Sequence, residues 1–232
     1  MMKRGIWSGA LAVALGMCAS AGVLAQVPPH AAEVLAYEGL HRAAWQGDLP
    51  KVKALIASGA NLDARDAKGR TPLHVATHAR QREAVKLLAK AGANLDALED
   101  DRYDAVTIAS VADDPTTLAL LLSLGANSGQ VTSRYDGTAL IAAAHLGHDE
   151  VVRKLIAAGA PLDHVNNLHW TALIEAIVLG DGGPRHQATL AALLRAGAST
   201  TLADRAGRTP LQLARDRGHR EMVRMLEAAG AR

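Results

Sequence analysis

The sequence of 232 residues contains no phenylalanine, and aromatic residues make up only 3% of it. Large aromatic side chains dominate the core of an ordinary globular protein, so this chain must build its interior differently. Its hydrophobic residues, 49% of the total, are mostly small or aliphatic. Such side chains suit thin helices that pack closely against nearly identical helices, which predicts a stacked helical repeat.

Cysteine is almost absent as well. Cys18 is the only one, so a disulfide within the chain is excluded. A lipid anchor on Cys18 would require a small residue before it, and Met17 stands in that place. If the N-terminal segment is removed, the mature chain has no thiol at all.

The first 25 residues are typical of a secretory signal peptide. Lys3 and Arg4 precede an apolar stretch at 6–23, and Val23-Leu24-Ala25 then supplies the small residues of a cleavage site. We expect cleavage after Ala25 and a mature protein that is periplasmic or secreted. The alternative is a retained membrane anchor. Serines and glycines within the apolar stretch disfavour it, so we expect no stable membrane insertion.

The chain also lacks an excess of charge of either sign. It has 25 basic and 23 acidic residues, and Lys3 and Arg4 account for the difference, so the mature chain carries 23 of each. Binding to nucleic acid requires a basic stripe and gives a strongly salt-dependent affinity. We therefore expect no nucleic-acid partner.

What the sequence does contain is an internal repeat. The dipeptide Gly-Ala recurs at spacings of 33, 33, 34, 38 and 33 residues, each time after a segment whose apolar residues have helical spacing. The pairs are Gly59-Ala60, Gly92-Ala93, Gly125-Ala126, Gly159-Ala160, Gly197-Ala198 and Gly230-Ala231. Glycine just after a helix adopts the left-handed conformation without a Cβ penalty, so the second helix of each unit should end there.

A second block recurs upstream of these helices. Thr71-Pro72-Leu73-His74 and Thr209-Pro210-Leu211 show it most clearly, and Gly147-His148 and Gly218-His219 follow later in their units. These elements resemble the ankyrin repeat, in which TPLH opens the first helix and Gly-His precedes the second. The resemblance implies an all-α fold, an ankyrin-repeat α-solenoid of about six helix-turn-helix repeats with short β-hairpin fingers.

This resemblance covers residues 36–232. We expect repeats at 36–65, 66–98, 99–132, 133–165, 166–203 and 204–232. A short lead-in at 26–35, which includes His30, precedes them and has no expected structure.

Two repeats depart from the pattern. Repeat three has Asp104-Ala105-Val106-Thr107 in place of TPLH and Asp113-Asp114-Pro115 in place of Gly-His. We therefore expect it to lack the usual caps and to be the weakest unit. Repeat five exceeds the 33-residue period by five residues around 180–186, a stretch expected between its two helices. Such an insertion is either functional or a neutral surface extension.

Histidines are numerous, but the sequence predicts no metal site or enzyme. His74 and His78, four residues apart on a helix, could geometrically reach one metal ion, yet the resemblance gives His74 a structural role and no third ligand is evident. The acidic cluster at 99–104 lacks the spacing of a calcium loop. No phosphate-binding loop or nucleophile elbow is present. We expect no catalytic residue and no cofactor.

Ankyrin proteins bind partners through the fingers and the exposed ends of the first helices, which line a concave face. Alignment of the repeats gives nine partner-binding candidates: Tyr37, Trp45, Arg70, His78, Tyr103, Tyr135, His145, Trp170 and Arg208. Leu168 and Leu179 occupy positions of the same two kinds.

The aromatic residues support this surface. All five Tyr and Trp residues beyond the signal peptide are among the nine candidates, and none is expected in the core. Tyr and Trp dominate interface hot spots, so we expect Trp170 and Tyr103 to carry much of the binding energy with little effect on stability. The alternative is that these rings brace adjacent fingers.

Together these patterns predict a non-catalytic, monomeric, periplasmic module that binds an envelope protein through its concave face and supports or restrains it. Three alternatives remain: an immunity protein against a secreted toxin, an exported effector, and a metal-binding protein or enzyme that uses His78, His145 and the acidic cluster.

Overall fold

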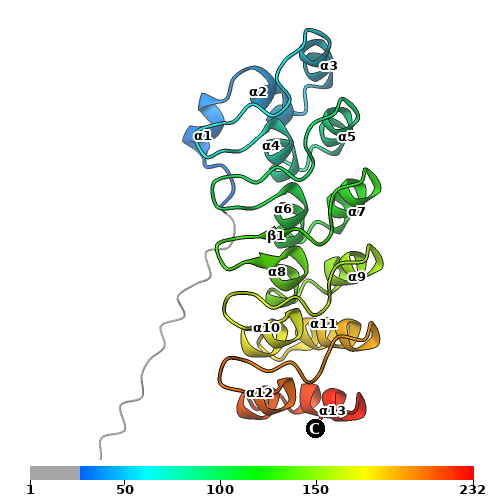
Figure 1. Cartoon of the computed structure of the whole chain (residues 1–232). Helices are drawn as coiled ribbons and strands as arrows, with labels where there is room; N and C mark the ends of the chain where they lie inside the picture. The colour runs from blue at the N-terminus through cyan, green and yellow to red at the C-terminus, as the bar shows by residue number, and fades with distance from the viewer. Residues whose placement is uncertain (1–26) are drawn as a thin grey trace, which may run out of the picture.

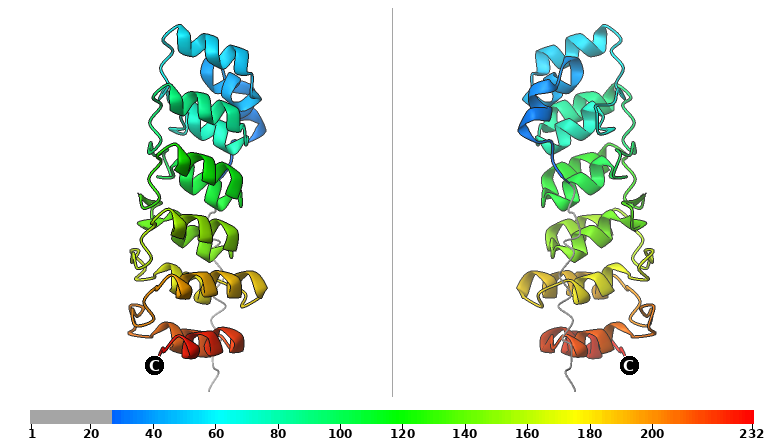
Figure 2. Two further views of the ribbon diagram at one scale, coloured as in Figure 1. Left: turned by 90° about the vertical axis from the view of Figure 1, so that its right-hand side faces the viewer. Right: turned by 90° about the vertical axis from the view of Figure 1, so that its left-hand side faces the viewer.

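A computed structural model describes residues 27–232. The expected signal peptide, its cleavage site and Cys18 lie outside the described residues. Pairs of antiparallel helices stack into an elongated solenoid, with a finger-like loop reaching out from between successive pairs (Figures 1 and 2). Within this part of the chain, no helix is long and apolar enough to cross a membrane.

The helices form two rows. The first row lies between the fingers and the second row (Figure 1) and consists of α2 (Gly39–Gln46), α4 (Pro72–His78), α6 (Ala105–Val111), α8 (Ala139–His145), α10 (Ala172–Val178) and α12 (Pro210–Asp216). The second row consists of α3 (Leu49–Ala57), α5 (Arg82–Lys90), α7 (Pro115–Ser123), α9 (Asp149–Ala157), α11 (Pro184–Arg195) and α13 (Arg220–Ala228). This arrangement confirms the expected solenoid of six helical pairs.

A single aliphatic core runs along the stack between the two rows. One residue in each first-row helix occupies the same register and is at most 6% exposed: Leu40, Leu73, Val106, Leu140, Leu173 and Leu211. Each helix alone is too short to be stable in water, so burial of this stripe against neighbouring repeats stabilises the helices.

The repeat motifs act as helix boundaries. Thr71 accepts a hydrogen bond from the backbone N–H of His74 and caps α4, whose first residue is Pro72. Gly92 follows α5 with φ of 98°, the left-handed conformation that a glycine adopts most easily. His74 is buried and its Nε2 lies 2.9 Å from the carbonyl oxygen of Ala97, so this side chain secures the following loop.

The lead-in is more ordered than the sequence predicts. Residues Ala31–Ala36 form helix α1, and the ring of His30 accepts a hydrogen bond from the backbone N–H of Glu33 at its N-terminus. The helix packs against the finger of repeat two, where Glu33 pairs with Arg70 at 2.9 Å. The expectation of an unstructured lead-in is therefore wrong from residue 31 onward.

Repeat three does have helix caps. Asp104 accepts from the backbone N–H of Thr107 at 2.7 Å and caps α6. Asp114 accepts from the backbone N–H of Thr117 at 3.0 Å and caps α7, and it also pairs with Arg82 of repeat two. The expectation that this repeat lacks caps is wrong, because aspartate takes the place of threonine and of the Gly-His turn.

The Asp104 cap lowers the stability of the folded state at neutral pH. Asp104 is 1% exposed, and burial raises its pKa to about 6 although the hydrogen bonds from Thr107 oppose that shift. A carboxyl whose pKa is raised by folding favours the folded state when protonated, so stability falls as pH rises from about 3.8 to about 6 and stays lower above that range.

Replacing Asp104 by asparagine should therefore stabilise the protein at pH 7.5 by about 2 kcal/mol and have little effect at pH 4, because asparagine keeps the cap and carries no charge. Urea denaturation at the two pH values measures this difference. Asp101→Asn, at an exposed position on the same finger, is the control. A loss of stability in Asp104→Asn at pH 7.5 would contradict the explanation.

The insertion in repeat five lengthens both a loop and a helix. The connection between α10 and α11 has five residues, 179–183, where that between α4 and α5 has three, and α11 has twelve residues where α5 has nine. The added turn contacts earlier repeats: His186 Nε2 lies 2.9 Å from the carbonyl oxygen of His145, and Arg185 pairs with Asp113 at 2.7 Å. Only part of the insertion thus lies between the helices, and these contacts favour a bracing role.

Four of the fingers are closed by the same kind of backbone hydrogen bond. In repeats two, three, five and six the first residue of the turn donates its backbone N–H to the carbonyl four residues later, as from Asp66 to Arg70 at 3.0 Å. The finger of repeat four instead contains the one two-stranded antiparallel sheet among residues 27–232, formed by β1 (Val131–Thr132) and β2 (Gly137–Thr138). Backbone bonds such as Asn167 N to Tyr135 O, at 2.9 Å, link neighbouring fingers.

Candidate functional site: a hollow between the fingers and the first-row helices

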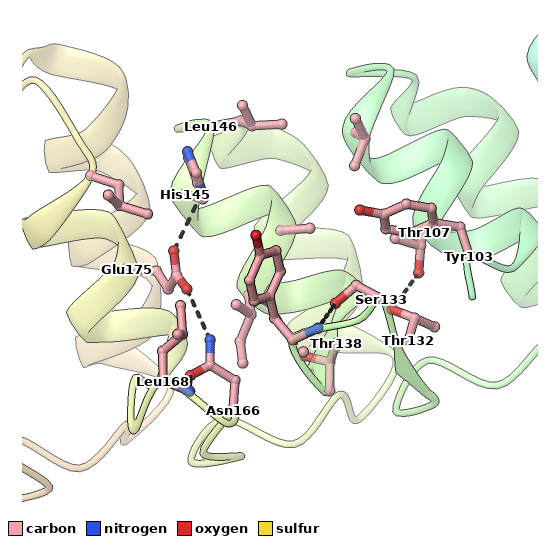
Figure 3. Close-up of a pocket in the computed structure, with 16 residues that line it drawn as sticks. Tyr103, Thr107, Thr132, Ser133, Thr138, His145, Leu146, Asn166, Leu168 and Glu175 are labelled. Atoms are coloured by element: carbon pink, nitrogen blue, oxygen red, sulfur yellow. Dashed lines mark hydrogen bonds and ion pairs between the residues drawn. The ribbon is translucent and has the colours of Figure 1, made fainter. Parts of the chain in front are cut away.

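A hollow opens where the fingers of repeats three, four and five face helices α6, α8 and α10 (Figure 3). Three of the nine candidates from the sequence line it: Tyr103, Tyr135 and His145. Leu168 and Leu179, a finger-tip and a helix-end position, also line it and are 37% and 38% exposed. The structure thus gathers residues from three repeats into one concave surface.

The two tyrosines are held by their fingers. The backbone N–H of Tyr103 donates to Glu99 Oε1 at 3.0 Å, and that of Tyr135 donates to the hydroxyl of Ser133 at 3.2 Å. Both side chains are half-buried. Burial, followed by the nearby Asp101 carboxylate, raises the pKa of Tyr103, so its hydroxyl stays protonated at neutral pH.

A buried carboxylate forms part of the wall. Glu175, on α10, is 4% exposed, and its Oε1 accepts a hydrogen bond from Asn166 Nδ2 at 3.0 Å. Its Oε2 makes no hydrogen bond but lies 3.4 Å from His145 Nδ1, within ion-pair distance (Figure 3). His145 is therefore the one side chain within ion-pair distance of this buried oxygen among the residues that line the hollow.

Glu175 is not among the residues predicted from the sequence, although the sequence does contain a signal for it. The position is two residues after the conserved-register leucine Leu173, where repeats two, three and six have Val75, Ile108 and Leu213, all buried. A carboxyl group at a position that is apolar and buried in three other repeats is costly to bury and points to a special role.

Asn166 is the second missed residue. It begins the finger of repeat five, where repeats two and six have Asp66 and Asp204. Its Oδ1 accepts from the backbone N–H groups of Leu168 and Trp170 at 3.0 and 2.9 Å, while its amide nitrogen donates to Glu175. Asparagine, unlike aspartate, can serve both the finger and the buried carboxylate.

Two candidates are structural rather than exposed. Tyr37 is 5% exposed and its hydroxyl donates to Asp66 at 3.1 Å, so the expectation that no aromatic residue lies in the core is wrong. Arg70 is 4% exposed and pairs with Glu33 and Asp66. Arg70 pairs with Glu33 of helix α1, which the sequence did not predict, and Tyr37 ends the same helix, so neither residue is part of the exposed surface.

Four further candidates lie apart from the hollow lining. Trp45 is half-buried, with its ring centroid 6.3 Å from that of Tyr37. Trp170 is half-buried and packs against the core. Arg208 is exposed and held by Asp204 at 2.7 Å. Burial lowers the pKa of His78 to about 3, so its imidazole is neutral at physiological pH.

Within residues 27–232, no group of three or more His, Cys, Asp or Glu side chains is placed to hold a metal ion. The hollow instead combines aromatic rings, exposed leucines and the buried Glu175 carboxyl group beside His145. Such a combination can bind a side chain or peptide by apolar contact.

Comparison with known proteins matches three overlapping segments of the chain, residues 40–132, 109–204 and 140–232, to the ankyrin-repeat family model. The ankyrin repeat protein YahD of Escherichia coli K12 is 38% identical over 190 residues, which cover 82% of this chain and 94% of YahD.

Solved structures agree with this result. An ankyrin repeat domain from Acinetobacter baumannii AYE is 46% identical, with a TM-score of 0.79 over 83% of this chain and 98% of that domain. A chain in the complex of the Bdellovibrio bacteriovorus predatory endopeptidase Bd0816 with immunity protein Bd3460 is 27% identical. Its TM-score is 0.69 over 83% of this chain and 98% of that one.

Proposed function

Because this chain belongs to the ankyrin-repeat family, we propose that it is a non-catalytic periplasmic module that binds an envelope protein through the hollow of repeats three to five. One observation carries the proposal. Tyr103, Tyr135, Leu168 and Leu179 face a common hollow although they come from three different repeats. Aromatic and leucine side chains grouped around a concavity supply the apolar contact area of a protein interface.

The proposed periplasmic location rests on the N-terminal sequence. Lys3 and Arg4, the apolar stretch at 6–23 and the triplet ending at Ala25 support export with removal of the leader. N-terminal sequencing of the exported protein should begin at Gln26. A sequence that begins at Met1 would refute the export half of the proposal.

The binding half is tested by affinity purification. The full chain, carrying a C-terminal tag and expressed in its own host, should retain a specific partner from an envelope extract. Tyr103→Ala combined with Tyr135→Ala should lose this partner. Retention of the same partner by that double variant would show that the hollow is not the binding surface.

Tyr103 and Trp170, the two aromatic residues singled out by the sequence, should differ in the effects of their replacement on binding and on stability. Tyr103→Ala should weaken partner binding by about 2 kcal/mol and change stability by less than about 0.5 kcal/mol, because this ring lines the hollow. Trp170→Ala should instead lower stability by about 1–2 kcal/mol, since its ring packs against the core. Melting curves and partner affinities of both variants test these expectations. Equal losses of stability in the two variants would contradict a binding role for Tyr103 and a packing role for Trp170.

A second candidate function is immunity against a secreted peptidase. The likeness to a chain of the Bdellovibrio complex, at 27% identity, favours it. Under this proposal the purified chain should inhibit a peptidase encoded beside its gene. A neighbouring peptidase that remains fully active in its presence would rule this version out.

A further inference from the structure

The hollow offers an incoming group no accessible charge. Glu175, the one acidic residue of the lining, is 4% exposed, and its buried Oε2 lies within ion-pair distance of His145 Nδ1. The lining contains neither lysine nor arginine. A charged group that entered would give up its hydration without an accessible counter-charge to replace it, which is unfavourable. The lining therefore favours an uncharged guest.

Charged residues that flank the two tyrosines in the sequence are paired between fingers. Arg102 on the finger of repeat three lies 3.0 Å from Asp136 on the finger of repeat four. Arg134 on the finger of repeat four lies 3.0 Å from Asp101 on the finger of repeat three. Each finger thus supplies the counter-charge of the other, and these four side chains add no net charge beside the hollow. Recognition in the hollow is therefore expected to depend on apolar contact.

The apolar lining of the hollow comes from several elements. Val111 belongs to α6, Ile141 to α8, Leu168 to the finger of repeat five and Leu179 to the connection after α10. Figure 3 shows Tyr103 and Leu168 on opposite sides of the hollow. An apolar side chain that enters would be removed from water on more than one side, which is what stabilises its binding.

The volume of the hollow decides which apolar side chain fits best. It is about 80 Å³, whereas a cavity of about 150 Å³ binds benzene. The ring of phenylalanine or tryptophan is therefore too large. The methyl group of alanine would leave most of the space empty and forfeit contacts with the lining. The isobutyl group of leucine lies between these limits.

We propose that the hollow binds a leucine side chain of the partner protein as the apolar anchor of the interface. The inference rests on the proposed function and names the chemistry that the hollow recognises. Ile141 is 6% exposed and lies deep in the lining, while Leu168 and Leu179 are 37% and 38% exposed and lie at its mouth. A leucine side chain would contact all three and gain apolar burial at each.

The test uses short peptides, so it does not require the partner to be known. The probe is an acetylated, amidated pentapeptide with leucine between alanines, titrated into the methyl-labelled protein and followed by NMR. Peptides with alanine, phenylalanine or lysine at the central position are the comparisons. The leucine peptide should shift the methyl signals of Leu168, Leu179 and Ile141 and bind about tenfold more tightly than each comparison peptide.

Two variants locate the effect. Ala142→Leu fills the hollow from its own wall, because Ala142 lies in the lining, and should weaken leucine-peptide binding about tenfold. Leu179→Asn removes apolar surface at an exposed position of the lining, so it should weaken binding without affecting folding. Ala157→Leu, at an exposed position on α9 outside the lining, is the control and should bind like the unaltered chain.

Several results would overturn the proposal. They are absence of binding by the leucine peptide, equal or tighter binding of any comparison peptide, and full binding by Leu179→Asn or by folded Ala142→Leu. Failure here is distinct from failure of the proposed function. If the envelope partner is retained by Leu179→Asn but lost with both tyrosines replaced, the hollow binds protein without a leucine anchor.

Discussion

Replacing Asn166 by aspartate should destabilise the protein at pH 7.5 by about 2–3 kcal/mol. The amide nitrogen of Asn166 now donates to Glu175 Oε1 at 3.0 Å, and both side chains are 4% exposed. Aspartate would place a second buried carboxylate against the first. Like charges at this distance cannot both remain ionised, so one of the two must take up a proton.

The effect should depend on pH in a defined direction. The shared proton raises the pKa of the pair in the folded state, so the loss of stability should be largest at neutral pH and shrink toward pH 5. Urea denaturation at pH 7.5 and pH 5 measures both values.

Two comparisons isolate the cause. Asn167→Asp makes the same change at the next, exposed position and should cost less than Asn166→Asp. The double variant Asn166→Asp with Glu175→Leu should recover most of the lost stability, because the second carboxylate is gone. If the double variant is as unstable as Asn166→Asp alone, repulsion between the two groups is not the reason.

Replacing Arg70 by methionine should release helix α1 and lower the free energy of unfolding by about 2–3 kcal/mol. Arg70 lies beneath α1, 2.9 Å from Glu33 and 3.5 Å from Asp66. Without the guanidinium, two partly buried carboxylates face each other with no cation between them. The first repeat should then open before the rest, since a solenoid loses its terminal units most easily.

The pH dependence follows from Glu33. Burial raises the pKa of this carboxyl, but the hydrogen bond from His30 and the Arg70 guanidinium outweigh it and hold the pKa below its usual value of 4.5. A carboxyl with a lowered pKa stabilises the fold above pH 4.5 and loses that contribution as pH falls further. The difference between Arg70→Met and the unaltered chain should therefore shrink below about pH 4.

Hydrogen exchange resolved along the chain tests the location of the effect. Protection should fall at residues 30–46 and stay unchanged in repeats four to six. Lys68→Met removes a positive charge from an exposed position on the same finger and is the control. Unchanged protection of α1 in Arg70→Met would contradict the assigned role of this ion pair.

Much of the fold could be predicted from the sequence because each repeat is specified locally. The Gly-Ala pairs, the Thr-Pro starts and one aliphatic stripe recur along the chain, and the helices of each unit pack mainly against those of its neighbours. Leu73 and Leu140, for example, are buried where the period places them. Even the fingers beside the hollow follow from this register, which is why Tyr103 and Tyr135 could be expected on one face.

Contacts between residues at different positions of the repeat could be found only from the tertiary structure. Tyr37 and Arg70 have the register of finger residues, yet Tyr37 ends helix α1 and Arg70 pairs with Glu33 of that helix, and no repeat pattern describes a helix that occurs once. Glu175 and Asn166 form a pair nine residues apart whose meaning depends on what surrounds it in three dimensions. Periodicity determines which positions face inward, but burial, charge pairing and unsatisfied atoms depend on the particular neighbours that each side chain meets.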